Sequence, residues 1–166
     1  PQRHRYERDP HPLGRVRLTV ADTVRHQVGA RPATADDGYG FPPGDPGWFG
    51  PGSMAWQVHR DFPAMITGGV AALLLQTLHP QVMAGVADHS SYRTDPLGRL
   101  QRTAHFVGVT TFGSSADAER AVETVTRIHR SVVGTTPEGE PYSALDPELL
   151  TWVHTTEVTS FVKAYQ

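Results

Sequence analysis

Apolar positions recur at helical spacing along most of this chain. The clearest example is the segment 62–78, which carries no formal charge and is strongly apolar from residue 66 onward. Apolar residues repeated every three or four positions are typical of helices that bury one face, and no strand-like alternation or internal repeat competes with them. The pattern predicts an all-α fold with helices at 15–28, 53–60, 62–78, 80–88, 96–112, 115–133 and 147–166.

Turn-forming residues mark the boundaries of these helices. The pairs Asp95-Pro96 and Asp146-Pro147 predict helix starts, because Asp caps a helix N-terminus and Pro suits the first turn. Residues 30–52 are rich in Gly, Pro and Asp and predict a loop. We therefore divide the chain into an irregular N-terminal segment with one helix, residues 1–52, and a helical domain, residues 53–166.

The composition narrows the chemistry. The chain has no cysteine, which excludes disulfides, thiolate metal ligands and covalent attachment of haem within it. A net charge of −2 gives no basis for nucleic-acid binding. The uncharged run is interrupted at Gly68-Gly69 and His79-Pro80, so it predicts a buried core helix and no transmembrane segment. Residues 1–17 lack the apolar stretch of a signal peptide, which favours a cytoplasmic location.

His129 is the first candidate for chemistry. It shares one face of its predicted helix with Val122, Val125 and Val132, so its ring is expected to point inward. Burial disfavours the charged imidazolium and leaves a neutral ring that can bind a metal. The spacing alone is more typical of a core histidine whose ring is bonded to a carbonyl oxygen.

Arg99 and Thr103 form a second candidate group with Arg102. Arg99 and Thr103 are four residues apart on one helix face, and Arg102 lies one step round it. This arrangement fits either a solvated arginine stripe or a site that holds a carboxylate or polarises bound oxygen.

His154 and Glu157 are three residues apart on the last predicted helix. Such a pair can belong to a di-iron site in a helix bundle, but that site uses the order Glu-x-x-His and repeats it on a second helix. A hydrogen-bonded pair without metal fits the same spacing.

Four sequence blocks together resemble a known family. They read HPQVMAGVADHS at 79–90, DPLGRLQRT at 95–103, IHRSVVG at 128–134 and YSALDPELLTWVH at 142–154. In this order they resemble the rubber oxygenases (latex-clearing proteins) and the mycophenolic acid oxygenase, although each block alone is a weak signal.

The resemblance implies a helical domain around haem b, with dioxygen and an apolar small molecule as substrates. It implies that His129 is the axial ligand of the haem iron and that Arg102 and Thr103 lie on the oxygen side. Arg99, one turn earlier, would hold a haem propionate or polarise oxygen, and His154 would lie near the cofactor. Family members are usually longer, so this chain is expected to lack the C-terminal helices.

Two departures from the family pattern keep an alternative open. Arg102 stands where the rubber enzymes have a lysine that can approach the iron, and Val133 stands where the family has arginine. The leading hypothesis is a haem-dependent oxygenase that cleaves or oxygenates an alkene, such as an isoprenoid. The alternatives are a helical binding module without catalysis and a di-iron oxidase.

Overall fold

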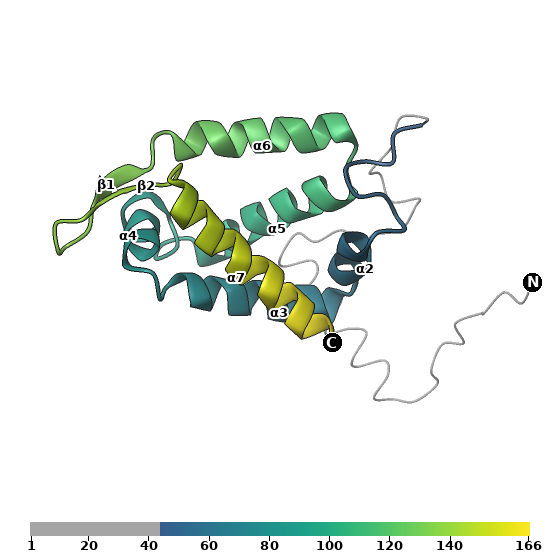
Figure 1. Cartoon of the computed structure of the whole chain (residues 1–166), viewed down its shortest axis with the longest axis horizontal. Coiled ribbons are helices and arrows are strands. Elements are labelled where there is room, and N and C mark those ends of the chain that lie inside the picture. The colour runs from purple at the N-terminus through teal and green to yellow at the C-terminus, as the bar shows by residue number, and fades with distance from the viewer. Residues whose placement is uncertain (1–43) are drawn as a thin grey trace, which may run out of the picture.

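The computed structural model describes residues 44–166. The helix predicted at 15–28 lies outside the described residues, as does most of the predicted N-terminal segment. The described residues form a mostly helical domain, which confirms the predicted fold class (Figure 1). Its helices are α2 (Met54–Arg60), α3 (Phe62–Gln76), α4 (Pro80–His89), α5 (Pro96–Phe112), α6 (Ser115–His129) and α7 (Pro147–Tyr165).

Short polar side chains start these helices where the sequence predicts. Asp61 accepts a hydrogen bond from the backbone N–H of Ala64 at 3.0 Å and so caps α3. Asp95 accepts one from Gly98 at 2.8 Å at the start of α5. Each cap satisfies a backbone donor that has no partner within its helix. The same device begins α2 at Ser53, α6 at Ser114 and α7 at Asp146.

The prediction that the sixth helix reaches residue 133 is wrong. α6 ends at His129, and the chain enters a two-stranded antiparallel sheet of β1 (Val133–Thr135) and β2 (Pro141–Ser143). The turn between the strands uses Gly139 with φ at +93°. Consecutive β-branched residues and a glycine disfavour a helix after His129, and the pairing supplies the backbone hydrogen bonds instead.

The main packing contact is between α3 and α7, which cross each other (Figure 1). The buried residues of α3 are small or polar and recur every four positions: Ala64, Gly68, Ala72 and Gln76. At Gly68 the helices are so close that an added Cβ would lie 2.8 Å from the Cα of Phe161. The small residues therefore allow α7 to approach α3 backbone to backbone.

The large apolar residues of α3 lie on its other sides. Leu74 is 65% exposed and Leu78, just beyond the helix, is 68% exposed. Among residues 44–166 no single helix is long and apolar enough to cross a membrane. Only α3 and α4 together have the length and composition, and they are bent by 104° at the break between them.

We predict that Gly68→Ala lowers the free energy of unfolding. The new methyl group meets the backbone of Phe161, which cannot rotate away, so overpacking costs about 1–3 kcal/mol. Gly69→Ala is the matched control, because its Cβ would lie 3.8 Å from the Phe161 ring. That variant should gain up to about 1 kcal/mol from helix propensity. Urea unfolding of both variants measures the difference, and equal stabilities would contradict the close crossing.

Candidate functional site

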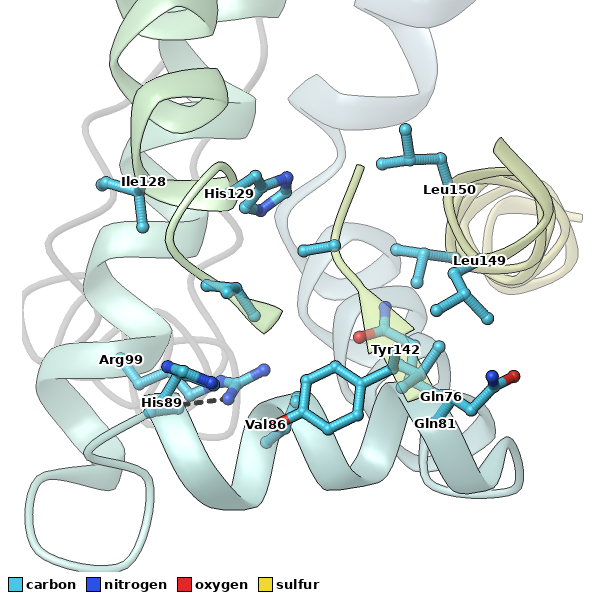
Figure 2. A pocket seen from close by; sticks show the side chains of 16 residues that line it. Gln76, Gln81, Val86, His89, Arg99, Ile128, His129, Tyr142, Leu149 and Leu150 are labelled. Atoms are coloured by element: carbon cyan, nitrogen blue, oxygen red, sulfur yellow. Dashed lines mark hydrogen bonds between the residues drawn. The ribbon is translucent and has the colours of Figure 1, made fainter. Parts of the chain in front are cut away.

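A pocket of about 260 Å³ lies between α4, α6, the hairpin and the start of α7 (Figure 2). Its walls are predominantly apolar, with a few polar side chains among them. The lining comprises Gln76, Gln81, Val82, Gly85, Val86, His89, Ser90, Arg99, Ile128, His129, Val132, Tyr142, Ala144, Leu149, Leu150 and Val153. We call this space the histidine pocket.

His129 enters this pocket from the last turn of α6. Its ring is half-buried, and within the described part of the chain it makes no hydrogen bond. Burial lowers the pKa of its imidazole below the ordinary value of 6.5. At neutral pH the ring is therefore uncharged and has a nitrogen lone pair for a ligand.

Arg99 reaches the same pocket from α5 (Figure 2). Its guanidinium donates to the hydroxyl of Ser90 at 2.7 Å. No carboxylate of residues 44–166 pairs with it, and burial, followed by the nearby charge of Arg102, lowers its pKa. A guanidinium stays charged even so, which makes Arg99 a half-buried cation suited to an anionic group of a ligand.

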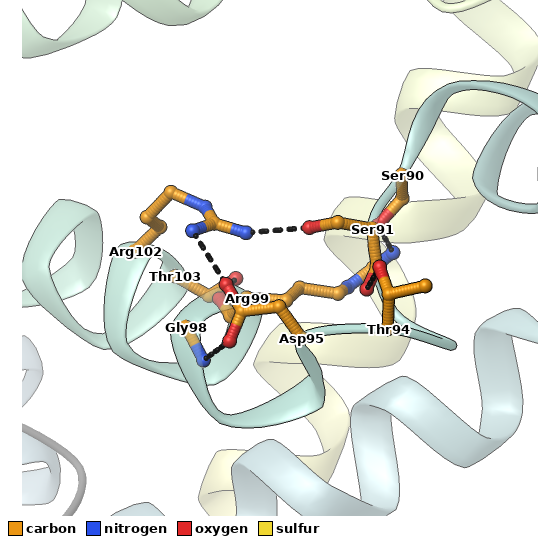
Figure 3. A network of polar contacts seen from close by, with 8 residues as sticks. All are labelled: Ser90, Ser91, Thr94, Asp95, Gly98, Arg99, Arg102 and Thr103. Atoms are coloured by element: carbon orange, nitrogen blue, oxygen red, sulfur yellow. Dashed lines mark hydrogen bonds and ion pairs between the residues drawn. The ribbon is translucent and has the colours of Figure 1, made fainter.

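Arg102 lies on the solvent side of α5, outside the histidine pocket (Figure 3). Its guanidinium is 3.3 Å from Asp95 Oδ2, and the side chains are 61% and 51% exposed. It also donates to the hydroxyl of Ser91 at 2.9 Å. In this arrangement Arg102 ties the start of α5 to the loop before it. Arg99 and Arg102 therefore lie on different faces of α5: Arg99 lines the histidine pocket, and Arg102 is exposed to solvent.

Thr103 and His154 also lie away from His129. Thr103 lines a second pocket between α3, α5 and α7, and its hydroxyl donates to the backbone oxygen of Arg99 at 3.1 Å. His154 is exposed on α7 and lies near Glu157, whose ionised form it favours. Of the predicted site residues, the structure brings only His129 and Arg99 into one pocket. The predicted roles of all five residues stay predictions.

The hairpin supplies a wall that the sequence did not predict. Tyr142 is buried on β2 and donates from its hydroxyl to Asp88 on α4 at 2.6 Å. That hydrogen bond, with burial and the charge of Asp88, raises the pKa of Tyr142 to about 12. Gln81 also donates to the backbone oxygen of Pro141 at 2.7 Å. The sequence predicted no strand between the helices at 115–133 and 147–166, so it gave no signal for this wall.

Glu157 is the other charged residue that reaches the interior. It lines the second pocket together with Gln76 and Thr103. Burial raises the pKa of its carboxyl group, and the charge of His154 and a hydrogen bond with Gln76 offset part of that rise. The sequence signal for a polar group in the interior was Gln76, which directly follows the apolar run 70–75 at the end of α3 and is 8% exposed.

The donor groups fit one kind of metal cofactor better than another. Within residues 44–166 no three His, Asp or Glu side chains gather to hold a metal ion, whereas a di-iron centre needs several such ligands. A haem needs one axial imidazole, an apolar cavity and a cation for its propionates. His129, the apolar walls and Arg99 provide these three.

Space for such a group extends beyond the histidine pocket. A neighbouring pocket of about 330 Å³ shares Gln76, Val86 and Arg99 with it. Ligand pockets typically measure roughly 300–1,000 Å³. The histidine pocket is slightly below that range, and the neighbouring pocket lies within it.

Comparison with known families gives one match. The family model described as "ER-bound oxygenase mpaB/B'/Rubber oxygenase, catalytic domain" matches residues 56–166, which is more than half of the chain. No curated protein and no solved structure is significantly similar to the chain.

We predict that Tyr142→Phe weakens the attachment of the hairpin to α4. Loss of the hydrogen bond to Asp88 should lower the free energy of unfolding by about 0.5–1.5 kcal/mol. Because the pKa of Tyr142 is raised, its contribution is present below its ordinary value of 10.0 and is lost as the pH rises through about 12. Unfolding measured across this range should show that decline in the wild type and not in Tyr142→Phe. Tyr165→Phe, exposed on α7, is the control and should behave like wild type.

We also predict that Glu157→Gln stabilises the chain at neutral pH. A raised pKa means that the folded state favours the protonated carboxyl group, so this contribution is present below the ordinary value of 4.5 and is lost as the pH rises. The variant should therefore have a higher Tm than wild type at neutral pH and the same Tm near pH 4.5. Glu119→Gln, exposed on α6, should show no such pH-dependent difference. If Glu157→Gln raised the Tm at acidic pH only, the inference that burial disfavours the ionised Glu157 carboxyl group would be contradicted.

Proposed function

Because this chain belongs to the family of mpaB and rubber oxygenase catalytic domains, we propose that it is a haem b-dependent oxygenase that uses dioxygen on an apolar substrate. The observation that carries the proposal is the histidine pocket, in which a neutral imidazole and a guanidinium that has no carboxylate partner among residues 44–166 lie within apolar walls. The imidazole comes from the block at 128–134 and the guanidinium from the block at 95–103.

His129 would hold the haem iron through its uncharged ring. When bound, haem supplies the activation of dioxygen, and the protein supplies binding, orientation and electrostatics. Arg99 would hold a propionate by charge-assisted hydrogen bonds, since its guanidinium lines the pocket and donates there to the hydroxyl of Ser90. Val86, Val132 and Leu149 line the pocket and would exclude water from the face of the macrocycle.

The apolar substrate would lie in the spaces beside α3. Two pockets adjoin this helix: its apolar residues Met65, Ile66, Val70 and Leu73 line one, and Val70, Leu73 and Leu74 line the other. Thr103 lines one of them and would contact the substrate or bound oxygen from α5. An alkene is the substrate class we favour, because these walls offer few polar groups to a ligand that needs many hydrogen bonds.

Arg102 takes part only through a rearrangement. Its guanidinium would have to leave Asp95 and Ser91 to turn toward the interior. These contacts are solvent-exposed, and exposed ion pairs contribute only about 0–1 kcal/mol, so such a movement is energetically accessible. If the chain binds no haem, the same contacts favour the alternative, a helical binding module without catalysis.

We predict that the chain purified after haem-replete expression has a Soret absorption band and that His129→Ala loses it. Arg99→Gln should keep the band but weaken haem affinity about tenfold, because one charge-assisted hydrogen bond is worth roughly 1.5–3 kcal/mol. His105→Ala is the control, since His105 is exposed on α5 and lines none of the pockets described above. Circular dichroism reports whether each variant is folded. A folded wild-type chain without porphyrin or iron would refute the oxygenase proposal.

A further inference from the structure

The pocket between α3, α5 and α7 is small and has one ionisable residue, Glu157, in its lining, and we call it the carboxyl pocket. Its volume is about 50 Å³, too small for more than the end of a ligand. Its walls are apolar except for three side chains, one from each helix: Gln76, Thr103 and Glu157. Two of the three, Gln76 and Glu157, are hydrogen-bonded to each other.

The carboxyl pocket adjoins the larger space beside α3. It shares Val70, Leu73 and Gln76 with the pocket of about 330 Å³, which in turn shares Arg99 and Val86 with the histidine pocket. An elongated molecule whose end occupied the carboxyl pocket would therefore pass Gln76 and reach the surroundings of Arg99. Apart from Gln76, Thr77, Tyr92 and Arg99, the residues that line this larger space are apolar.

The polar side chains leave mainly hydrogen-bond acceptors for a ligand. The Thr103 hydroxyl already donates to the backbone oxygen of Arg99, so it presents an oxygen lone pair. Gln76 satisfies only part of the Glu157 carboxyl group, which has about four lone-pair sites. A buried carboxyl group without enough partners is unfavourable. A ligand that donates a hydrogen bond would relieve this deficit.

Among simple end groups, a hydroxyl fits these requirements best. It donates to Glu157 when the carboxyl group is ionised and accepts from it when it is protonated. An ether oxygen can only accept. A ligand carboxylate would place a second negative charge beside Glu157, which is unfavourable in an apolar site.

We propose that Glu157, with Gln76 and Thr103, binds the hydroxyl end of an elongated apolar alcohol. That this alcohol is a substrate rests on the proposed function, whereas its binding does not require haem. Anchoring at the carboxyl pocket fixes one end of the chain, so the distance from the hydroxyl determines which carbon lies near the histidine pocket. Glu157 is then the residue that sets where along its substrate the oxygenase acts.

The test compares two ligands with the same carbon chain, one ending in a hydroxyl group and the other in a methyl ether. Isothermal titration calorimetry with the full chain would use 1-decanol and its methyl ether, which cannot donate a hydrogen bond. We expect the alcohol to bind about tenfold more tightly, as one hydrogen bond to a charged group allows. Equal affinities, or no measurable binding of the alcohol, would overturn the proposal. Decanoate should bind more weakly than the alcohol.

Two variants of Glu157 test whether this residue is responsible for the preference for the alcohol over the ether. Glu157→Leu should bind the alcohol and the ether equally, and Glu157→Gln, which keeps the size and a partner for Gln76, should lose most of the preference. Glu119→Gln on the exposed surface of α6 should retain it. A preference that persists in both Glu157 variants would place the hydroxyl elsewhere and overturn the proposal. The Soret band is measured on the same samples, so failure of haem binding is recognised separately from failure of alcohol binding.

Discussion

The close crossing of α3 and α7 at Gly68 and Phe161 is the contact on which the remaining arrangement depends. Because Gly68 has no side chain, the two helices meet almost backbone to backbone. This contact places the start of α7 beside the hairpin and its middle beside α5 (Figure 1). It also turns the bulky apolar residues of α3 away from α7, where they line pockets or face outward.

The pockets follow from what fills the space around that crossing. Around Gly68, where α3 has no side chain, α3 and α7 meet almost backbone to backbone. Where leucine, valine and methionine project, they hold α4 and α5 at a distance and leave connected spaces. The hairpin then closes the other side, because Tyr142 lies on Gly85 and is hydrogen-bonded to Asp88. A helical domain with one short hairpin can thus enclose an apolar path with polar groups at its ends.

Few charged side chains reach the interior of the described domain. Arg99 and Glu157 are the half-buried cation and anion that reach the connected pockets, and each lacks a salt-bridge partner among the described residues. Arg102, only one turn from Arg99, is neutralised at the surface by Asp95. Arg99 and Glu157 can therefore bind a ligand, because a buried charge is stabilised by a partner of opposite charge or by a hydrogen bond.

The sequence by itself determined the helices and the family. Asp-Pro pairs and apolar periodicity placed the starts of α5 and α7, because capping and helix propensity act over a few adjacent residues. The inward position of His129 also followed from its spacing. Only the tertiary structure decided that α6 ends at that histidine, that Arg99 and not Arg102 shares its pocket, and that Glu157 meets Gln76. Those outcomes depend on how whole helices pack against one another, and local spacing does not contain that information.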